Sequence, residues 1–203
     1  AMERLTALGE LDSTRLCHAE HYAALSARAS PEIRGPGYSK WAARLFAELN
    51  QLRHAIDTFM ALDRPDAVIQ IGADLHVFFL HNGLQVEFID SMVSAAAAAS
   101  ETDPTRIRGW WLASIMGAGI SDPRAVDQAR AGLAEARATN DQNLIGRMEL
   151  ALGAAIRNSS VDFAEPLKHL TEGRRLLDAH PEPYWWDPTW EEGFLQLTIA
   201  MYL

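Results

Sequence analysis

Apolar side chains recur every three or four residues along almost the whole chain, and no stretch shows the sustained alternation of a half-buried strand. The clearest series follows one face of a helix and consists of Trp41, Leu45, Leu49, Leu52, Ile56 and Phe59. Such a face has to be covered by another element, because packing supplies most of the stability of an amphipathic helix. The pattern therefore predicts an all-α chain whose helices bury one another.

Breakers and capping residues divide this pattern into about nine helices. The first is expected over residues 13–29, before Pro31, and Ser39 is expected to cap a second helix that carries the apolar series. Pro65 opens a third helix, so apolar that neighbours should cover it on several sides before Asn82-Gly83 ends it. The others are expected over 84–99, from Asp103-Pro104, from Asp122-Pro123, over 141–157, over 163–179 and from Asp187-Pro188.

Part of a repeat is visible in the second half of the chain. Tetratricopeptide (TPR) hairpins of about 34 residues have small and large apolar residues at spacings that are matched by Gly117, Ala129, Leu133 and Ala136. We therefore predict stacked antiparallel hairpins that form a TPR-like, right-handed α-solenoid with degenerate repeats. One domain is expected over residues 1–203, with N-terminal helices in 1–100 and degenerate hairpins in 101–203. Because the apolar pattern runs on to Leu203, we expect a fragment of a longer chain.

Charge and cysteine content narrow the class of protein. The chain has 18 Lys and Arg against 27 Asp and Glu, and this net charge of −9 opposes docking on a phosphate backbone. Cys17 is the only cysteine, which excludes an intrachain disulfide and favours a reducing cytoplasm. Next to Leu16 on a helix, Cys17 is expected to be a small buried residue. No apolar run approaches the roughly 20 residues of a membrane span.

The search for catalytic motifs gives no active site. The chain contains no phosphate-binding loop, zinc-protease helix, nucleophile elbow or calcium loop. Gly117-Ala118-Gly119 resembles a dinucleotide fingerprint, but it ends an expected helix and follows no strand. We expect no catalytic residues, no cofactor and no metal. The alternative is a small helical metalloprotein or enzyme that uses His18, Glu20 and His21, in which the two imidazoles are one turn apart.

Clustered aromatic residues are the candidate partner or ligand surface. They comprise Trp110, Trp111, Tyr184, Trp185, Trp186 and Trp190. Adjacent residues on a helix point about 100° apart, so both members of a pair rarely enter the same core and one is free to line a groove. The interpretation that we favour is simpler, namely that these side chains wedge adjacent hairpins together.

Between Arg15 and Gly83 the chain carries a series of short motifs. They are His18-x-x-His21-Tyr22, Gly35-Pro36, Trp41-x3-Leu45-x2-Glu48, Leu52-Arg53-x-Ala55-Ile56, and Phe78-Phe79 before Asn82-Gly83. This series resembles the segment that follows the nucleotide-binding module in large bacterial STAND ATPases of the LuxR and AfsR type. The motif residues are mostly of the kind that fills a core.

The resemblance implies a helical sensor arm of a multidomain transcriptional regulator. Such an arm receives a protein partner or a small-molecule inducer and biases an ATPase, while a separate domain binds DNA. We thus expect a non-catalytic interaction domain that contacts other domains of the same regulator. A homodimer is an additional possibility for this domain. A purely structural dimerisation scaffold is the further alternative.

Overall fold

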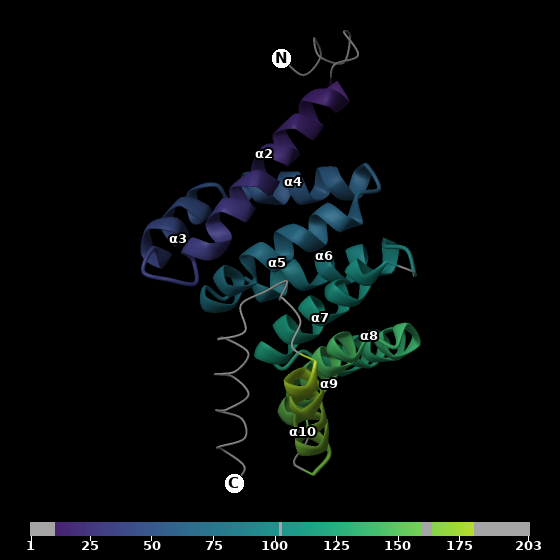
Figure 1. Cartoon of the computed structure of the whole chain (residues 1–203). Helices are drawn as coiled ribbons and strands as arrows, with labels where there is room; N and C mark the ends of the chain where they lie inside the picture. Colours follow the sequence, from purple (N-terminus) through teal and green to yellow (C-terminus); the bar gives the residue numbers. More distant parts are fainter. Residues whose placement is uncertain (1–10, 102, 160–163, 181–203) are drawn as a thin grey trace.

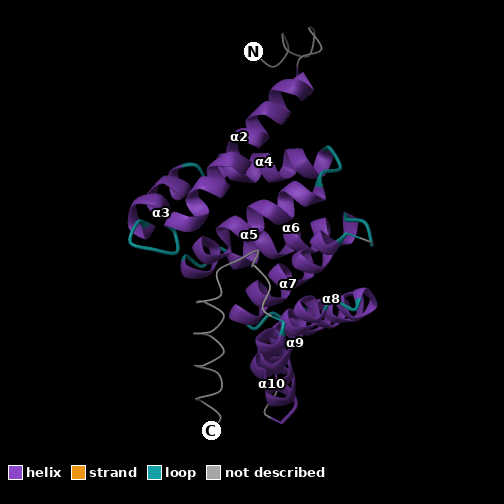
Figure 2. Cartoon of the chain, in the orientation of Figure 1, coloured by secondary structure: helices purple, strands orange, loops and turns teal. Residues whose placement is uncertain are grey.

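The computed structural model describes residues 11–101, 103–159 and 164–180. Within these ranges the chain forms nine α-helices and no strand, which confirms the all-α prediction (Figure 2). The helices are α2 (Leu11–Glu32), α3 (Tyr38–Ala47), α4 (Leu49–Ala61), α5 (Pro65–His81), α6 (Gln85–Ala98), α7 (Pro104–Gly119), α8 (Ala125–Thr139), α9 (Gln142–Ser159) and α10 (Ala164–Ala179). None of them is long and apolar enough to cross a bilayer. The helix expected from Asp187-Pro188 lies outside the described residues.

The long second helix of the sequence prediction is wrong, because the chain breaks it into α3 and α4 at Glu48. This residue has φ −99° and ψ 5°, and it ends one helix and precedes the next. Five members of the apolar series are nevertheless buried, and only Trp41 is half-exposed. The periodicity therefore predicted which side chains enter the core, although it did not show the break.

Three other helix ends also differ from the prediction. Pro31 lies inside the last turn of α2, where its missing N–H costs one backbone hydrogen bond on the exposed side of the helix. Ser39 does not cap α3, because Gly37 occupies the cap position and Ser39 is already inside the helix. The Asp122-Pro123 signal makes a turn in which Asp122 accepts a hydrogen bond from the Arg124 amide, so α8 begins only at Ala125.

Other capping signals are confirmed. The Asp103 carboxylate accepts a hydrogen bond from the Thr105 amide, and Pro104 is the first residue of α7. Asp141 accepts from the amides of Asn143 and Leu144 at the start of α9. Gly83 has φ +70°, the left-handed conformation that ends α5.

Successive helices pack mainly on their neighbours in sequence, from α2 at one end of the molecule to α10 at the other (Figure 1). In addition, α5 packs on α7 and α7 on α9, so these three helices form a row. They begin at residues 65, 104 and 142, and the successive starts are therefore 39 and 38 residues apart. This interval is longer than the roughly 34 residues of a TPR unit. The four residues that suggested the repeat are all buried where α7 and α8 meet.

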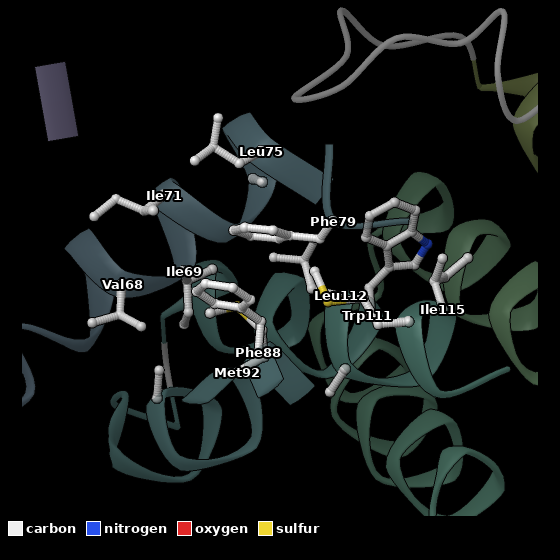
Figure 3. Packing of buried hydrophobic residues seen from close by; sticks show 14 of the residues in the cluster. Val68, Ile69, Ile71, Leu75, Phe79, Phe88, Met92, Trp111, Leu112 and Ile115 are labelled. Atoms are coloured by element: carbon white, nitrogen blue, oxygen red, sulfur yellow. The ribbon is translucent and has the colours of Figure 1, made fainter. Parts of the chain in front are cut away.

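The core is thickest around α5, which packs on α2, α4, α6 and α7. Every residue of α5 from Ile71 to Phe79 is buried, as its apolar composition predicted. Figure 3 shows side chains of α5 interleaved with Phe88 and Met92 of α6 and with Trp111 and Leu112 of α7. The rings of Phe79 and Phe88 stack with centroids 3.8 Å apart. This core fixes the positions of the helices on either side of α5.

Candidate functional site

An open groove of about 820 Å³ separates the first turns of α2 from the second half of α4. Its walls are largely apolar, with Leu11 and Thr14 on the α2 side and Ala61 and Leu62 at the end of α4. Leu62 keeps 40% of its surface exposed. In volume the groove falls within the range of about 300–1,000 Å³ that is common for ligand pockets, but it is open along its length.

The groove exists because α2 and α4 are held together at one end only. The Tyr22 hydroxyl donates to the Glu48 carboxylate over 2.8 Å, and the rings of His18 and Tyr22 lie 4.8 Å apart. His18 Nε2 lies 2.9 Å from Gln51 Oε1, one turn further along the pair. Among the described residues of α2, the first buried side chain is Ala19. The turns before it do not close on α4.

The polar side chains at the groove are mixed, with two carboxylates, one guanidinium, two imidazoles and two hydroxyls. Asp57 and His54 are exposed on α4, and neither side chain has a hydrogen-bond or ion-pair partner among the described residues. Asp12 Oδ1 lies 3.8 Å from Arg15 Nη1, also on α2, and 83% of the Asp12 side chain is exposed. A pair this exposed contributes little stability. Two carboxylates, one guanidinium and the imidazoles of His18 and His54 therefore surround an apolar floor, and Asp57 is the carboxylate that is left without a counter-charge among the described residues.

A second polar feature surrounds the buried Asp74 and links α2, α5 and α7. Asp74 of α5 is only 8% exposed, and its Oδ1 accepts a 2.9 Å hydrogen bond from Gln70, while Oδ2 accepts none. The Gln70 side chain in turn accepts from Arg108 of α7 over 2.9 Å. Arg34, just after α2, donates to the Ala73 carbonyl at 3.4 Å. We call the buried Asp74, together with the half-buried Arg34 and Arg108 and the exposed Gln70 around it, the buried charge cluster.

Burial dominates the electrostatics of this cluster. It raises the pKa of Asp74, and the Gln70 hydrogen bond and the charges of Arg108 and Arg34 only partly oppose the rise. It also lowers the pKa of Arg108, against the attraction of Asp74. A buried carboxylate without compensating contacts is costly, so Asp74 depends on the Gln70 hydrogen bond and on the charges of Arg108 and Arg34. The cluster therefore favours one arrangement of the three segments.

A third polar contact ties the last three described helices together. The side chain of Glu149 in α9 is 5% exposed, and it accepts a 2.7 Å hydrogen bond from Arg137 of α8. Its other oxygen lies 2.6 Å from His169 Nδ1 of α10. Glu149 thus fixes α8 and α10 relative to α9.

Of the predicted aromatic surface, Trp110 and Trp111 lie among the described residues. Trp111 is 2% exposed and packs edge-on against His76, with ring centroids 5.8 Å apart. Trp110 is half-buried between α7 and α8, where its Nε1 donates to Glu135 over 3.1 Å. Trp111 therefore packs on α5 and Trp110 contacts α8, and a partner or ligand surface at these residues stays a prediction. The remaining candidates, Tyr184, Trp185, Trp186 and Trp190, lie outside the described residues.

The residues of the metalloprotein alternative do not converge. His18 faces Gln51, whereas Glu20 and His21 are exposed on α2. Nowhere in residues 11–101, 103–159 and 164–180 do three His, Cys, Asp or Glu side chains form a group suited to a metal ion. The expectation that Cys17 is buried is wrong, because its thiol is exposed on α2. No residue from Leu11 to His18 is buried, so the Cys17 thiol stays in solvent, although Leu16 beside it packs against the core.

Comparison with known proteins adds no relative. No protein-family model, no curated protein and no solved structure matches the chain. Several of the motif residues behind the STAND resemblance make contacts between helices, whereas His21, Pro36 and Gly83 are exposed. Besides the Tyr22–Glu48 bond, Asn82 donates to the Tyr38 hydroxyl over 2.7 Å and so joins α5 to α3.

Proposed function

We propose that this chain is a non-catalytic interaction or sensor domain of a multidomain bacterial transcriptional regulator of the STAND type. Its helical hairpins form a TPR-like, right-handed solenoid. The domain receives a protein partner or a small-molecule inducer and relays that binding to an ATPase domain and a DNA-binding domain elsewhere in the regulator.

The observation that carries this proposal is the row of α5, α7 and α9, in which each unit touches the next. In such an arrangement the stability is roughly a sum of local interfaces, so a small rotation at each interface changes the curvature of the whole. Ion pairs join the units across their outer helices, as between Arg53 of α4 and Glu87 of α6. Arg124, at the start of α8, pairs with Asp90 of α6 at 2.7 Å.

The relay follows from differential binding. A partner that binds one curvature more tightly shifts the population toward it, and the shift is limited by the difference between the two affinities. The buried charge cluster lies where α2 meets the row, through α5 and α7. A rotation of α7 against α5 would therefore change the contacts that Arg34 makes at the end of α2.

Site-specific cross-linking in the full-length natural protein tests the proposal. A photoreactive amino acid is placed singly at Thr58 in the groove, at Ser94 on the exposed side of α6, and at Ala134 on the exposed side of α8. We expect a reproducible cross-link to one partner, or to another domain of the regulator, from one face and not from all three. Substitutions on that face should also abolish regulated transcription. Substrate turnover within residues 11–180 that is lost on one side-chain change would overturn it.

A further inference from the structure

We propose that the groove between α2 and α4 binds a short, basic amphipathic α-helix of a protein partner. This inference rests on the proposed function, since it names the class of partner and the place where it docks.

The shape of the groove suits a helix. Two antiparallel helices that are closed at one end by Tyr22–Glu48 and open at the other leave room for a third helix against both. The α2 wall runs from Leu11 to His18. Eight helical residues span about 12 Å, so the occupant needs two to three turns.

The floor of the groove supplies apolar contacts. Leu11, Ala61 and Leu62 line it, together with the methyl groups of Thr14 and Thr58. Helices that bind such grooves use apolar anchors at positions i, i+3 or i+4, and i+7. The groove is short, so the association is weak and transient compared with a standard protein interface.

A carboxylate without a counter-charge at the rim favours a basic partner. Asp57 has no partner among the described residues, whereas Asp12 is paired with the exposed Arg15, and His18 and His54 also line the groove. The whole chain carries a net charge of −9, which attracts cations over a longer range. The same carboxylates repel nucleic-acid phosphates and anionic lipid headgroups, so a protein helix is favoured over both.

The probe is a 16-residue helical peptide with leucines along one face and lysines on the other, labelled with fluorescein. A second peptide replaces every lysine by glutamate. Binding of each peptide to the whole 203-residue chain is followed by fluorescence anisotropy. We expect the lysine peptide to bind at least about tenfold more tightly, and its affinity to fall as salt increases.

Matched variants separate the groove from general attraction to an acidic protein. Asp57→Lys and Leu62→Ser should each weaken the lysine peptide by about fivefold or more, with Asp57→Asn intermediate. Asp127→Lys makes the same charge change on α8, which packs on α7 and α9. Ile120→Ser removes an equally exposed apolar side chain, 38% against 40%, at the far end of α7. Both controls should stay within about twofold of the unchanged protein.

Three outcomes overturn the proposal: equal binding of the two peptides, equal weakening by the controls, or unchanged affinity in the Asp57 and Leu62 variants. Thermal unfolding of each variant shows whether it is folded. If Asp57→Lys does not fold, Asp57→Asn takes its place, because asparagine has the shape of aspartate without its charge. A partner cross-linked only from Ser94 or Ala134 would reject the groove and keep the proposed function. Absence of cross-links from all three positions would reject both.

Discussion

The hydroxyl of Tyr22 in α2 donates a 2.8 Å hydrogen bond to the carboxylate of Glu48, the residue that separates α3 from α4. Burial, followed by this hydrogen bond and the Glu48 charge, raises the pKa of Tyr22. One contact therefore joins three helices and closes one end of the groove.

Replacing this hydroxyl tests its contribution to stability. Tyr22→Phe is expected to lower the free energy of unfolding by about 1 kcal/mol, because the ring remains in place and one hydrogen bond is lost. Denaturant titrations of Tyr22→Phe, Glu48→Gln and the double variant give the coupling between the two groups. If the effects of the two substitutions simply add, the contact does not join the helices.

Periodicity predicted the buried side chains near Glu48 but not the break itself. The apolar series continues in phase across residue 48, so nothing in the spacing of Leu45 and Leu49 marks two helices. The break becomes understandable from a partner 26 residues earlier, Tyr22, which a local pattern does not contain. The helix caps could be predicted from the sequence. The hydrogen bonds that the side chains of Asp103 and Asp141 accept come from amides only two or three residues later.

The closest approach of α6 and α7 depends on a glycine. A Cβ atom at Gly109 would lie 2.8 Å from the Ala96 Cβ and 3.0 Å from Ile69 Cδ1. Gly109→Ala gains about 1 kcal/mol of helix propensity, but the crowding costs about 1–3 kcal/mol, so we expect a net loss of stability. Gly119→Ala is the control, because its Cβ would meet nothing closer than 3.5 Å. Urea unfolding should separate the two variants, and equal stabilities would contradict the packing.

The exposed thiol of Cys17 gives a kinetic prediction. In the folded protein a maleimide should modify Cys17 at a rate comparable with that of the urea-unfolded chain. A thiol that is reached only through global unfolding would react at least about a thousandfold more slowly than the thiol of the unfolded chain. Modification should change the free energy of unfolding by less than about 0.5 kcal/mol. The readout is mass spectrometry over time, and strong protection would restore the expectation of a buried cysteine.

The candidate site was less predictable than the fold. Asp74 does interrupt the most apolar helix, and a charged residue in that setting is a visible signal of a buried polar contact. Its charged neighbours Arg34 and Arg108 come from segments about 35 to 40 residues away on either side, so spacing could not name them. The groove left no local signal either, because Leu11 and Leu62 meet only through the crossing of α2 and α4.

The carboxyl groups of Asp74 and Asp66 should affect stability with opposite dependence on pH. Burial raises the pKa of Asp74 from its ordinary 3.8, so the folded state holds this proton more tightly than the unfolded chain. The Arg64 hydrogen bond lowers the pKa of Asp66, so the folded state releases that proton more readily. Both aspartates lie on α5, which makes their asparagine variants a matched pair.

The sign follows from proton linkage, under which stability falls with rising pH where the folded state binds more protons. Relative to Asp74→Asn, the unchanged protein should be most stable below pH 3.8 and lose that advantage as pH rises toward the raised pKa. Relative to Asp66→Asn, it should gain stability as pH rises to 3.8 and lose it as pH falls through the lowered pKa. Because other titrating groups cancel in each difference, unfolding curves between acid and neutral pH measure the two slopes directly. Slopes of the same sign would mean that Asp74 is solvated in the folded protein, and the link between α2, α5 and α7 would then lose its electrostatic basis.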